Sequence, residues 1–418
     1  MTDNLLRPSV NADPFGRYYT SDWISDALIR SIPVKSPSVI IDLGSGGGAL
    51  TNVAAKRWEK ARIVTVDSDG DAETATFIQN GRSAKRQHFV YDALDEHLDD
   101  KIRVRLSTVD VAICNPPYIR PKWKDTFGNI LEEAGLTSSL KSIYDASADV
   151  LFIAQNLRFL RREGRLGIIL PDGIITGEKF AGLRRLLLNS HKIESVTQLP
   201  RRVFSSTEVQ THLLVLQKGM SSNGDVTLRS LNRDGNLTES IQIPAELGSH
   251  RLDFEYHNAT RLKKKTKAKH FTLDEHASLI TRGTLNSKIA RESEYDVFHT
   301  DCFPPSNSKT ITLPLNREHY SIVKQQVPTH TVFAAPGDIL LARVGRNFNE
   351  KVCQVKKGWG LISDCVFLIR VDEKYRQSVF KYFNSDQGRD WLCAISRGTG
   401  ARYITVSDLK QLRIPITY

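Results

Sequence analysis

The feature that most constrains the fold of this chain is a series of short apolar runs that each end in an acidic or amide side chain. Four such runs follow one another, and they stop at Asp42, Asp67, Asp92 and Asn115. Runs rich in Val and Ile suit strands that are buried on both faces of a parallel sheet. Because helical patterns alternate with strand patterns up to about residue 220, the sequence predicts an α/β fold with a doubly wound, mostly parallel sheet.

The fourth run, residues 109–114, leads into Asn115-Pro116-Pro117-Tyr118. Neither proline can continue a sheet, so Asn115 is expected at the edge where open α/β sheets bind their ligands. An ordinary Pro-Pro turn after a strand is the alternative explanation for these four residues. The other motifs of the chain are therefore needed to distinguish a ligand-binding site from a purely structural turn.

These residue types fit chemistry on an exocyclic aromatic amine, which is a poor nucleophile because its lone pair is delocalised into the ring. The side-chain oxygen of Asn115 and the carbonyl oxygen of Pro116 would each accept one N–H and draw the nitrogen towards tetrahedral geometry. The consecutive prolines would hold both acceptors rigidly. Tyr118 would offer its ring face to a base taken out of the double helix. This chemistry requires neither a metal nor a nucleophilic side chain.

A glycine turn, Gly44-Ser45-Gly46, follows the first run and its acid Asp42. Glycines let a backbone approach a ligand closely, although many strand-to-helix turns are purely structural. The second run ends in Asp67, and an acid at that place is well positioned to bind ribose hydroxyls. The turn and the acid together favour a ligand that contains ribose.

A change in composition divides the chain, because residues 219–250 are rich in Gly, Ser, Asn and Asp. We expect a first domain at 1–220, a linker at 221–250 and a second, mixed α+β domain at 251–418. Residues 1–220 contain 29 Lys and Arg and 26 Asp and Glu, whereas residues 221–418 contain 29 and 21. The second half is therefore better suited to a polyanion, although charge alone fits a solvated basic surface equally well.

One basic run, residues 261–270, is expected either as a phosphate-contacting loop or as a solvated face. The five cysteines are widely separated and form no Cys-x-x-Cys pair, so neither a disulfide framework nor a zinc site is expected. No stretch has the ~18 apolar residues of a membrane span. These features predict a cytoplasmic protein without a metal or a membrane partner.

Taken in order, the motifs resemble those of the gamma-class N6-adenine DNA methyltransferases, over essentially the whole chain. The N-terminal segment of that family is similar to Gly16-Arg17-Tyr18-Tyr19-Thr20, and the glycine turn and Asn-Pro-Pro-Tyr follow it in the family's order. Two departures are visible. Ser21 replaces the customary proline, and Asp67 is one methylene shorter than the usual Glu.

The resemblance implies a class I methyltransferase fold that binds S-adenosyl-L-methionine. Asp92 matches the acid that holds the amino group of the cofactor's adenine, and Phe152 matches an aromatic residue beside the cofactor. The implied cofactor-binding residues are Tyr19, Thr20, Asp42, Gly44, Ser45, Gly46, Asp67, Asp92 and Phe152, and the implied catalytic residues are Asn115, Pro116, Pro117 and Tyr118. The resemblance also assigns Phe204, with Tyr118, to stacking on the target base, and core packing is the equal alternative for Phe204.

The second half resembles the target-recognition domains of type I restriction specificity subunits and of single-chain adenine methyltransferases. Residues 336–345 and 397–409 carry this similarity. The resemblance implies site-specific transfer of a methyl group to the N6 of a flipped adenine in double-stranded DNA, within a restriction-modification or related defence system. No segment is long enough for a nuclease domain, so a restriction endonuclease would be a separate polypeptide.

Three other functions stay open. The first is N4-cytosine methylation, because cytosine carries a similar amine, although that class more often has Ser at the position of Asn115. The second is methylation of a protein glutamine or of ribosomal RNA, which also uses Asn-Pro-Pro-Tyr. The third is a catalytically idle DNA-recognition subunit, against which the intact Asp42, Asn115 and Tyr118 argue.

Overall fold

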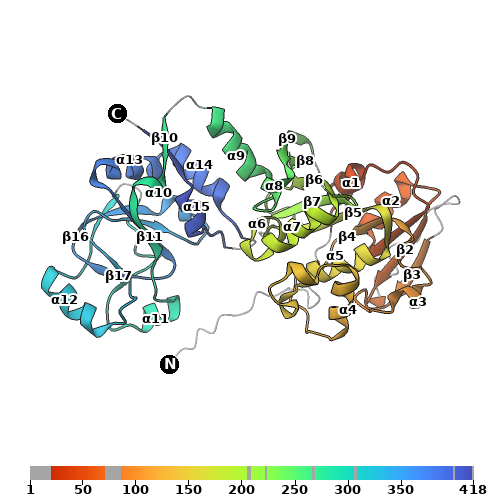
Figure 1. The fold of residues 1–418 in the computed structure, drawn as a ribbon, viewed down its shortest axis with the longest axis horizontal. Coiled ribbons are helices and arrows are strands. Elements are labelled where there is room, and N and C mark those ends of the chain that lie inside the picture. Colours follow the sequence, from red (N-terminus) through yellow and green to blue (C-terminus); the bar gives the residue numbers. More distant parts are fainter. Residues whose placement is uncertain are drawn as a thin grey trace. The chain divides into compact units, whose positions relative to one another are not determined.

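The computed structural model describes residues 20–70, 86–204, 209–221, 224–265, 269–305, 308–398 and 401–416. The chain forms two compact units, Met1–His257 and Asn258–Tyr418 (Figure 1). Each unit has its own sheets and its own hydrophobic core.

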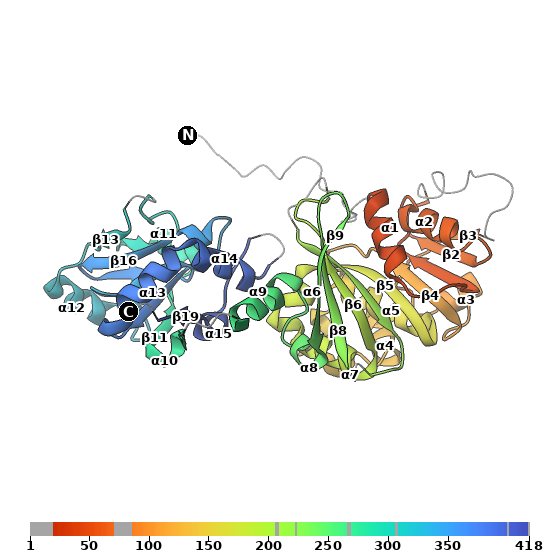
Figure 2. The same ribbon diagram turned by 90° about the horizontal axis from the view of Figure 1, so that it is seen from above.

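The first unit is built on a sheet that contains nine strands within the described residues, in the order β3-β2-β1-β4-β5-β7-β6-β8-β9 (Figure 2). From β3 to β5 all neighbouring strands are parallel, whereas β7 and β9 run antiparallel to their neighbours. The prediction of an α/β fold with a mostly parallel sheet is confirmed. The strands are β1 (Val39–Leu43), β2 (Arg62–Asp67), β3 (Arg86–Val90), β4 (Val109–Cys114), β5 (Leu160–Pro171), β6 (Lys192–Gln198), β7 (Thr211–Gln217), β8 (Asp225–Leu231) and β9 (Leu237–Pro244).

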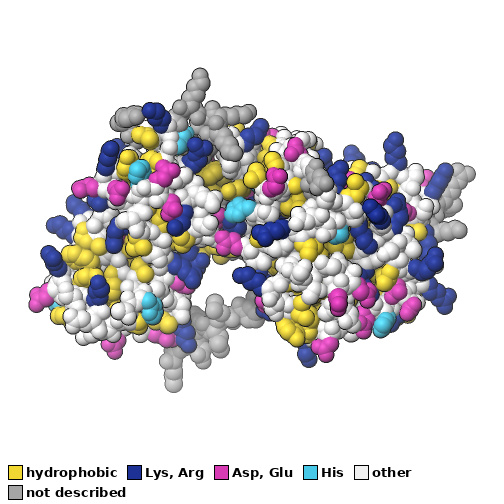
Figure 3. All heavy atoms as spheres, in the orientation of Figure 1, with side chains coloured by type: hydrophobic (Ala, Val, Ile, Leu, Met, Phe, Trp, Pro, Cys, Tyr) yellow, Lys and Arg dark blue, Asp and Glu magenta, His cyan; other side chains and the backbone are white. Residues whose placement is uncertain are grey.

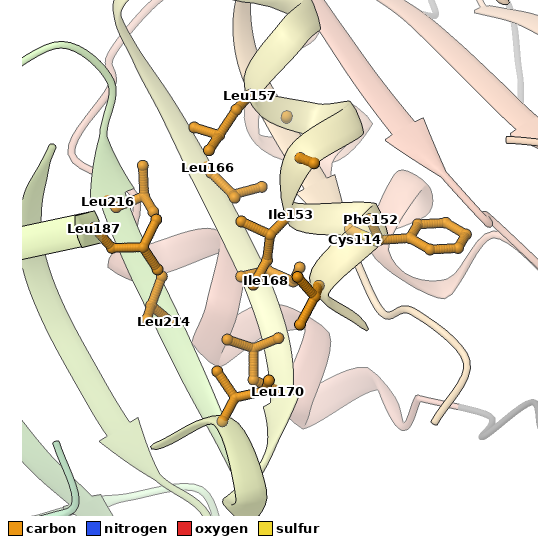
Figure 4. Packing of buried hydrophobic residues seen from close by; sticks show 14 of the residues in the cluster. Cys114, Phe152, Ile153, Leu157, Leu166, Ile168, Leu170, Leu187, Leu214 and Leu216 are labelled. Atoms are coloured by element: carbon orange, nitrogen blue, oxygen red, sulfur yellow. The ribbon is translucent and has the colours of Figure 1, made fainter. Parts of the chain in front are cut away.

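Helices cover both faces of this sheet (Figure 2). Side chains of adjacent residues in one strand point to opposite faces, so Ile40 packs in the cluster with α1 and α2 while Ile41 packs in the cluster with α4, α5 and α7. Ile153 and Leu157 of α5 lie against Leu166 of β5 in that second cluster (Figure 4). The helices are α1 (Asp22–Ser31), α2 (Ala49–Arg57), α3 (Leu98–Ile102), α4 (Thr126–Glu133), α5 (Ala148–Phe159), α6 (Asp172–Thr176), α7 (Ala181–Ser190) and α8 (Ala245–Gly248).

The expected linker at 221–250 is wrong as a structural assignment. Strands β8 and β9 occupy most of it, and β8 pairs with β6 of the large sheet. Val226 and Leu228 of β8 also pack into the core of the first unit. Gly, Ser, Asn and Asp, in which this region is rich, are typical of the tight turns of a hairpin. They are equally typical of a linker, so the sequence pattern did not distinguish the two.

The boundary between the units instead falls within helix α9 (Phe254–Lys265). The loop expected at 261–270 is therefore helical up to Lys265, and β10 (His270–Thr272) ends the run. Lys, Arg and Leu have good helix propensity, so a basic run of this kind is compatible with a helix.

The second unit combines helices with sheets of two, five and three strands among its described residues. Its largest sheet has the order β11-β18-β15-β16-β13 and is mainly antiparallel. No helix in the described parts of the chain has the length and apolarity needed to cross a membrane. The remaining strands and helices are α10 (Leu273–His276), β11 (Ala277–Arg282), α11 (Ser287–Glu292), β12 (Val297–Phe298), β13 (Thr310–Thr312), α12 (Arg317–Gln326), β14 (Phe333–Ala334), β15 (Ile339–Ala342), β16 (Val352–Lys357), β17 (Gly360–Ile362), β18 (Val366–Val371), α13 (Glu373–Asn384), α14 (Asp386–Ile395), α15 (Val406–Lys410) and β19 (Arg413–Pro415).

A first prediction tests the packing of α7. A Cβ atom at Gly182 would lie 2.5 Å from the backbone oxygen of Ser139, so Gly182→Ala must displace backbone and should destabilise the first unit by about 1–3 kcal/mol. Gly173→Ala is the matched control, because a Cβ there has no neighbour within 4 Å. Thermal unfolding should show a lower midpoint for Gly182→Ala and an unchanged or higher one for Gly173→Ala. Equal midpoints would contradict this packing.

Candidate active site

The predicted polar strand ends meet at one edge of the large sheet. Asp42 lies in β1 opposite Ile113 of β4, and Asp67 ends β2 opposite Val90 of β3. Asn115 directly follows β4. Because β1, β2, β3 and β4 are parallel, these side chains share the edge formed by the carboxyl ends of the strands.

The glycine turn after β1 is fastened to the end of β2. The backbone N–H groups of Gly44 and Ser45 donate to the carbonyl oxygen of Val66 at 2.8 and 3.1 Å. The N–H of Gly46 donates to Oδ2 of Asp67 at 2.7 Å. Gly46 has a φ of 49°, which favours glycine, so its N–H is aimed at the carboxylate by a backbone conformation that other residues rarely adopt.

Asp67 is buried and accepts a second backbone hydrogen bond, from the N–H of Asp69 to Oδ1 at 2.9 Å. An ionised carboxylate has about four acceptor sites, so each oxygen of Asp67 retains capacity for one more donor. The carboxylate therefore both shapes the turn and suits a pair of neighbouring hydroxyl groups.

Asp42 is the most strongly perturbed acid at this edge. Its Oδ2 accepts a hydrogen bond from the hydroxyl of Thr51, the third residue of α2, at 2.6 Å. Burial raises the pKa of Asp42 to about 7, and the negative charge of Asp67 acts in the same direction. Oδ1 is buried without a hydrogen-bond partner among the described residues, so it is open to a donor from a ligand.

An aromatic ring and an acid flank the turn. The ring of Phe152 is buried next to Gly44, where an added Cβ would lie 3.2 Å from Cε1 of that ring. Figure 4 shows the ring directed away from Leu187 and Leu214. Asp92 is exposed just beyond β3, and its Oδ2 accepts a hydrogen bond from Nζ of Lys124 at 2.6 Å.

Asn115 is held at both ends of its carboxamide. Nδ2 donates to Oγ1 of Thr20 at 2.9 Å, and Oδ1 accepts from the hydroxyl of Tyr118 at 3.1 Å. The Tyr118 hydroxyl also lies 3.4 Å from the carbonyl oxygen of Ile169 in β5, which gives it a second acceptor. Pro116 is buried, while Asn115, Pro117 and Tyr118 are half-buried. The carboxamide thus has one defined orientation at the sheet edge.

Two further residues, Phe204 and Tyr19, were expected at the site. Phe204 is buried in the core cluster that contains Leu199, Leu213 and Val215, so the structure agrees with core packing for this ring. Its stacking on a base stays a prediction. Tyr19 lies outside the described residues.

Two partners of the site were not expected from sequence. Thr51 binds Asp42, and its place in the first turn of the helix after a glycine turn was the available signal. Lys124 binds Asp92 from a loop that no pattern connects to β3. Among the described residues, no group of three or more His, Cys, Asp and Glu is placed to hold a metal ion.

The N-6 DNA Methylase family matches residues 7–242 of this sequence. A match over more than half of the chain places it in that family: the chain belongs to the N-6 DNA methylases.

Curated relatives are similar to about half of the chain. The methylase subunit of the type I restriction enzyme MpnII from Mycoplasma pneumoniae is 26% identical over 218 residues, which are 49% of this chain and 40% of that protein. The methylase subunit of the type I restriction enzyme EcoEI from Escherichia coli is 23% identical over 233 residues, 52% of this chain and 45% of that protein. The chain thus spans less than half the length of either relative.

Among solved structures, the type I restriction-modification methyltransferase subunit from Streptococcus thermophilus is 18% identical. The aligned region covers 60% of this chain and 54% of that one, with a TM-score of 0.42.

A second prediction follows from the buried Asp42. Its folded-state pKa of about 7 lies above the ordinary pKa of 3.8 for this carboxyl group, so its contribution to stability is fully present below pH 4 and is lost as the pH rises through 7. Asp42→Asn removes this titration. The unfolding temperature of Asp42→Asn minus that of the wild type should therefore increase from pH 5 to pH 8. A difference that stays constant over this range would show that Asp42 does not titrate there.

Proposed function

We propose that this chain is a site-specific DNA methyltransferase that transfers a methyl group from S-adenosyl-L-methionine to the N6 of a flipped adenine in duplex DNA. The observation that carries this proposal is the fixed carboxamide of Asn115, which lies at the same sheet edge as the glycine turn and Asp67. Such an amide provides an acceptor for an amine N–H beside a site that suits a nucleoside.

The residues of this edge fit S-adenosyl-L-methionine. The two oxygens of Asp67 suit the two ribose hydroxyls, and the glycine turn allows close approach of the backbone. The ring of Phe152 and the carboxylate of Asp92 would contact the adenine of the cofactor, the latter after Lys124 moves aside. The orphaned Oδ1 of Asp42 would receive a donor. Bound there, the cofactor supplies an electrophilic methyl group on a sulfonium sulfur.

Asn115 and Pro116 would activate the target amine. Oδ1 of Asn115 and the carbonyl oxygen of Pro116 each accept one N–H, which turns the nitrogen lone pair out of conjugation with the ring. The Tyr118 hydroxyl now donates to Oδ1, and it has the carbonyl oxygen of Ile169 as an alternative acceptor when the amine arrives. The ring of Tyr118 would stack on the base.

The two units would divide the work. We assign cofactor binding and chemistry to Met1–His257 and reading of the DNA sequence to Asn258–Tyr418. Met1–His257 contains 32 Lys and Arg and 32 Asp and Glu, whereas Asn258–Tyr418 contains 26 and 15, so the second unit holds the whole net charge of +11. DNA binding depends strongly on such positive charge. A restriction endonuclease on a separate polypeptide would complete a restriction-modification system.

A third prediction tests the reaction. Purified wild-type protein with S-adenosyl-L-methionine should form N6-methyladenine in genomic duplex DNA, detected by mass spectrometry of the nucleosides. Asn115→Ala should abolish this product while cofactor affinity stays nearly unchanged, because the side chain acts on the amine. Asn129→Ala is the matched control, since its amide binds Glu96 on the surface. N4-methylcytosine as the product would refute adenine as the target, and a folded, cofactor-binding protein without any product would refute the proposal.

A fourth prediction concerns Thr20, which lies 95 residues before Asn115 in the chain and accepts its Nδ2 hydrogen bond. Thr20→Val keeps the shape of the side chain but removes the acceptor, so the carboxamide loses its fixed orientation. Turnover at saturating cofactor should fall about tenfold, because the loss of one hydrogen bond of ~1.4 kcal/mol from the transition state lowers the rate by about that factor. Thr20→Ser keeps the oxygen and should restore most of the turnover. Weaker cofactor binding with unchanged saturated turnover would instead make Thr20 a contact to the cofactor.

A further inference from the structure

The loops at the two ends of the five-stranded sheet in the second unit differ sharply in charge. Strands β11, β18 and β15 are antiparallel neighbours, with Arg282 opposite Phe367 and Ala342 opposite Val366. The loops after β11 and β15 and the loop before β18 therefore gather at one end, which we call the 282/342 end. It is formed by residues 282–288, 343–347 and 363–365.

The 282/342 end is basic and the opposite end is acidic. Residues 282–288, 343–347 and 363–365 contain four cations and one acid, which are Arg282 at the end of β11, Lys288 in α11, Arg343 and Arg346 in the loop after β15, and Asp364 before β18. At the opposite end, the residues next to the same strands, including α10 and the start of α13, contain one cation, Lys374, and five acids, which are Asp274, Glu275, Asp338, Asp372 and Glu373. Asp338 is buried and pairs with Arg370. Figure 3 shows Lys and Arg interspersed with Asp and Glu over the visible face of this unit.

A further segment adds a cation to the 282/342 end. The N–H of Gly345 donates to the carbonyl oxygen of Arg402 at 3.0 Å, and the N–H of Ile404 donates to that of Arg343 at 3.1 Å. These bonds hold residues 402–404 beside the loop after β15. The side chains of Arg282, Lys288 and Arg402 form no hydrogen bond or ion pair with any described residue, so their charges are available to a partner.

The backbone of this end is fixed in advance. Arg397 and Asp408 are both buried and form a two-pronged pair, with nitrogen–oxygen distances of 3.0 and 2.6 Å. Arg397 also exchanges two backbone hydrogen bonds with Tyr403. On the other side of the end, the N–H of Asp364 donates to the carbonyl oxygen of Leu285 at 2.8 Å. Preorganised loops lose little conformational entropy when they bind, so less of the binding free energy is spent on ordering them. This is an advantage when the partner is itself rigid and cannot adapt to the protein.

We propose that the 282/342 end is the surface that meets the phosphates of duplex DNA, with Arg282, Lys288 and Arg402 as phosphate contacts. This inference rests on the proposed function, because it names the DNA-contacting loops of the second unit. Duplex DNA carries one negative charge per ~1.7 Å along its axis, and a protein that neutralises phosphates releases counterions. A cation at the end of β11, one in α11 and one beside the loop after β15 place several positive charges at one sheet end, where this linear array of negative charge could meet them.

The test compares two double variants of the full chain that lose the same net charge. Arg282→Ala with Arg402→Ala removes two cations from the 282/342 end. Lys356→Ala with Lys357→Ala removes two exposed cations at the end of β16, which lies towards the opposite end of the sheet. Binding of a labelled duplex pool of random sequence is measured by fluorescence anisotropy between 50 and 200 mM salt.

The arginine variant should weaken binding and reduce the slope of log K against log salt by about 1.8, or ~0.9 for each lost phosphate contact. The lysine variant should keep the wild-type slope. Arg282→Lys with Arg402→Lys keeps both charges and should also keep the slope, which separates loss of contacts from loss of folding. Equal effects of the alanine variants, or no effect of the arginine variant, would overturn the assignment.

A competition with single-stranded RNA of the same length completes the design. Duplex DNA should compete better than this RNA, and the reverse order would overturn duplex DNA as the partner. The readout is independent of catalysis. If the wild type methylates adenine while the arginine variant binds DNA normally, the surface is wrong and the proposed function stands. If the wild type methylates nothing, the proposed function fails while the binding data still decide the surface.

Discussion

Two buried carboxylates at one sheet edge set the geometry of the first unit. A carboxylate taken out of water must gain hydrogen bonds or give up its charge. Asp67 receives two backbone N–H groups, whereas Asp42 receives one hydroxyl and has a raised pKa. The left-handed backbone conformation of Gly46 directs its N–H towards the carboxylate of Asp67. The shape of the turn and the placement of the acid are therefore one property, and any nucleoside bound there depends on both.

The orientation of Asn115 depends on parts of the chain that are remote in sequence. The two ends of a carboxamide are nearly equal in shape, so neighbours decide which end faces a substrate. Thr20, two residues before the start of α1, accepts from the nitrogen, and α1 packs against the sheet through Ile24 and Leu28. Ile169 in β5 supplies the second acceptor for the Tyr118 hydroxyl. The packing of α1 thus influences the orientation of the Asn115 carboxamide.

Sequence periodicity predicted the first unit well where strands are buried on both faces, as in β1, β2 and β4, since an unbroken apolar run has few alternatives. It failed at β8 and β9, because a hairpin at the end of a sheet alternates polar and apolar residues and has turn residues like those of a linker. The acids and Asn115 were found because parallel strands must present their ends at one edge. Thr51 and Lys124 were missed because hydrogen-bond partners across a fold leave no local pattern. Likewise, apolar Phe204 did not reveal by type alone that it packs in the core.

The second unit contains a buried ion pair, formed by Arg397 and Asp408. A buried ion pair adds little net stability, because desolvation offsets most of the attraction. It does require one geometry, and here Thr405 shares Asp408 through its hydroxyl and its backbone N–H. Tyr403, which exchanges two backbone hydrogen bonds with Arg397, is therefore tied to this pair. Because Arg402 directly precedes Tyr403, its backbone would be fixed before a phosphate binds, and the proposed contact would cost less conformational entropy than one made by a flexible cationic loop.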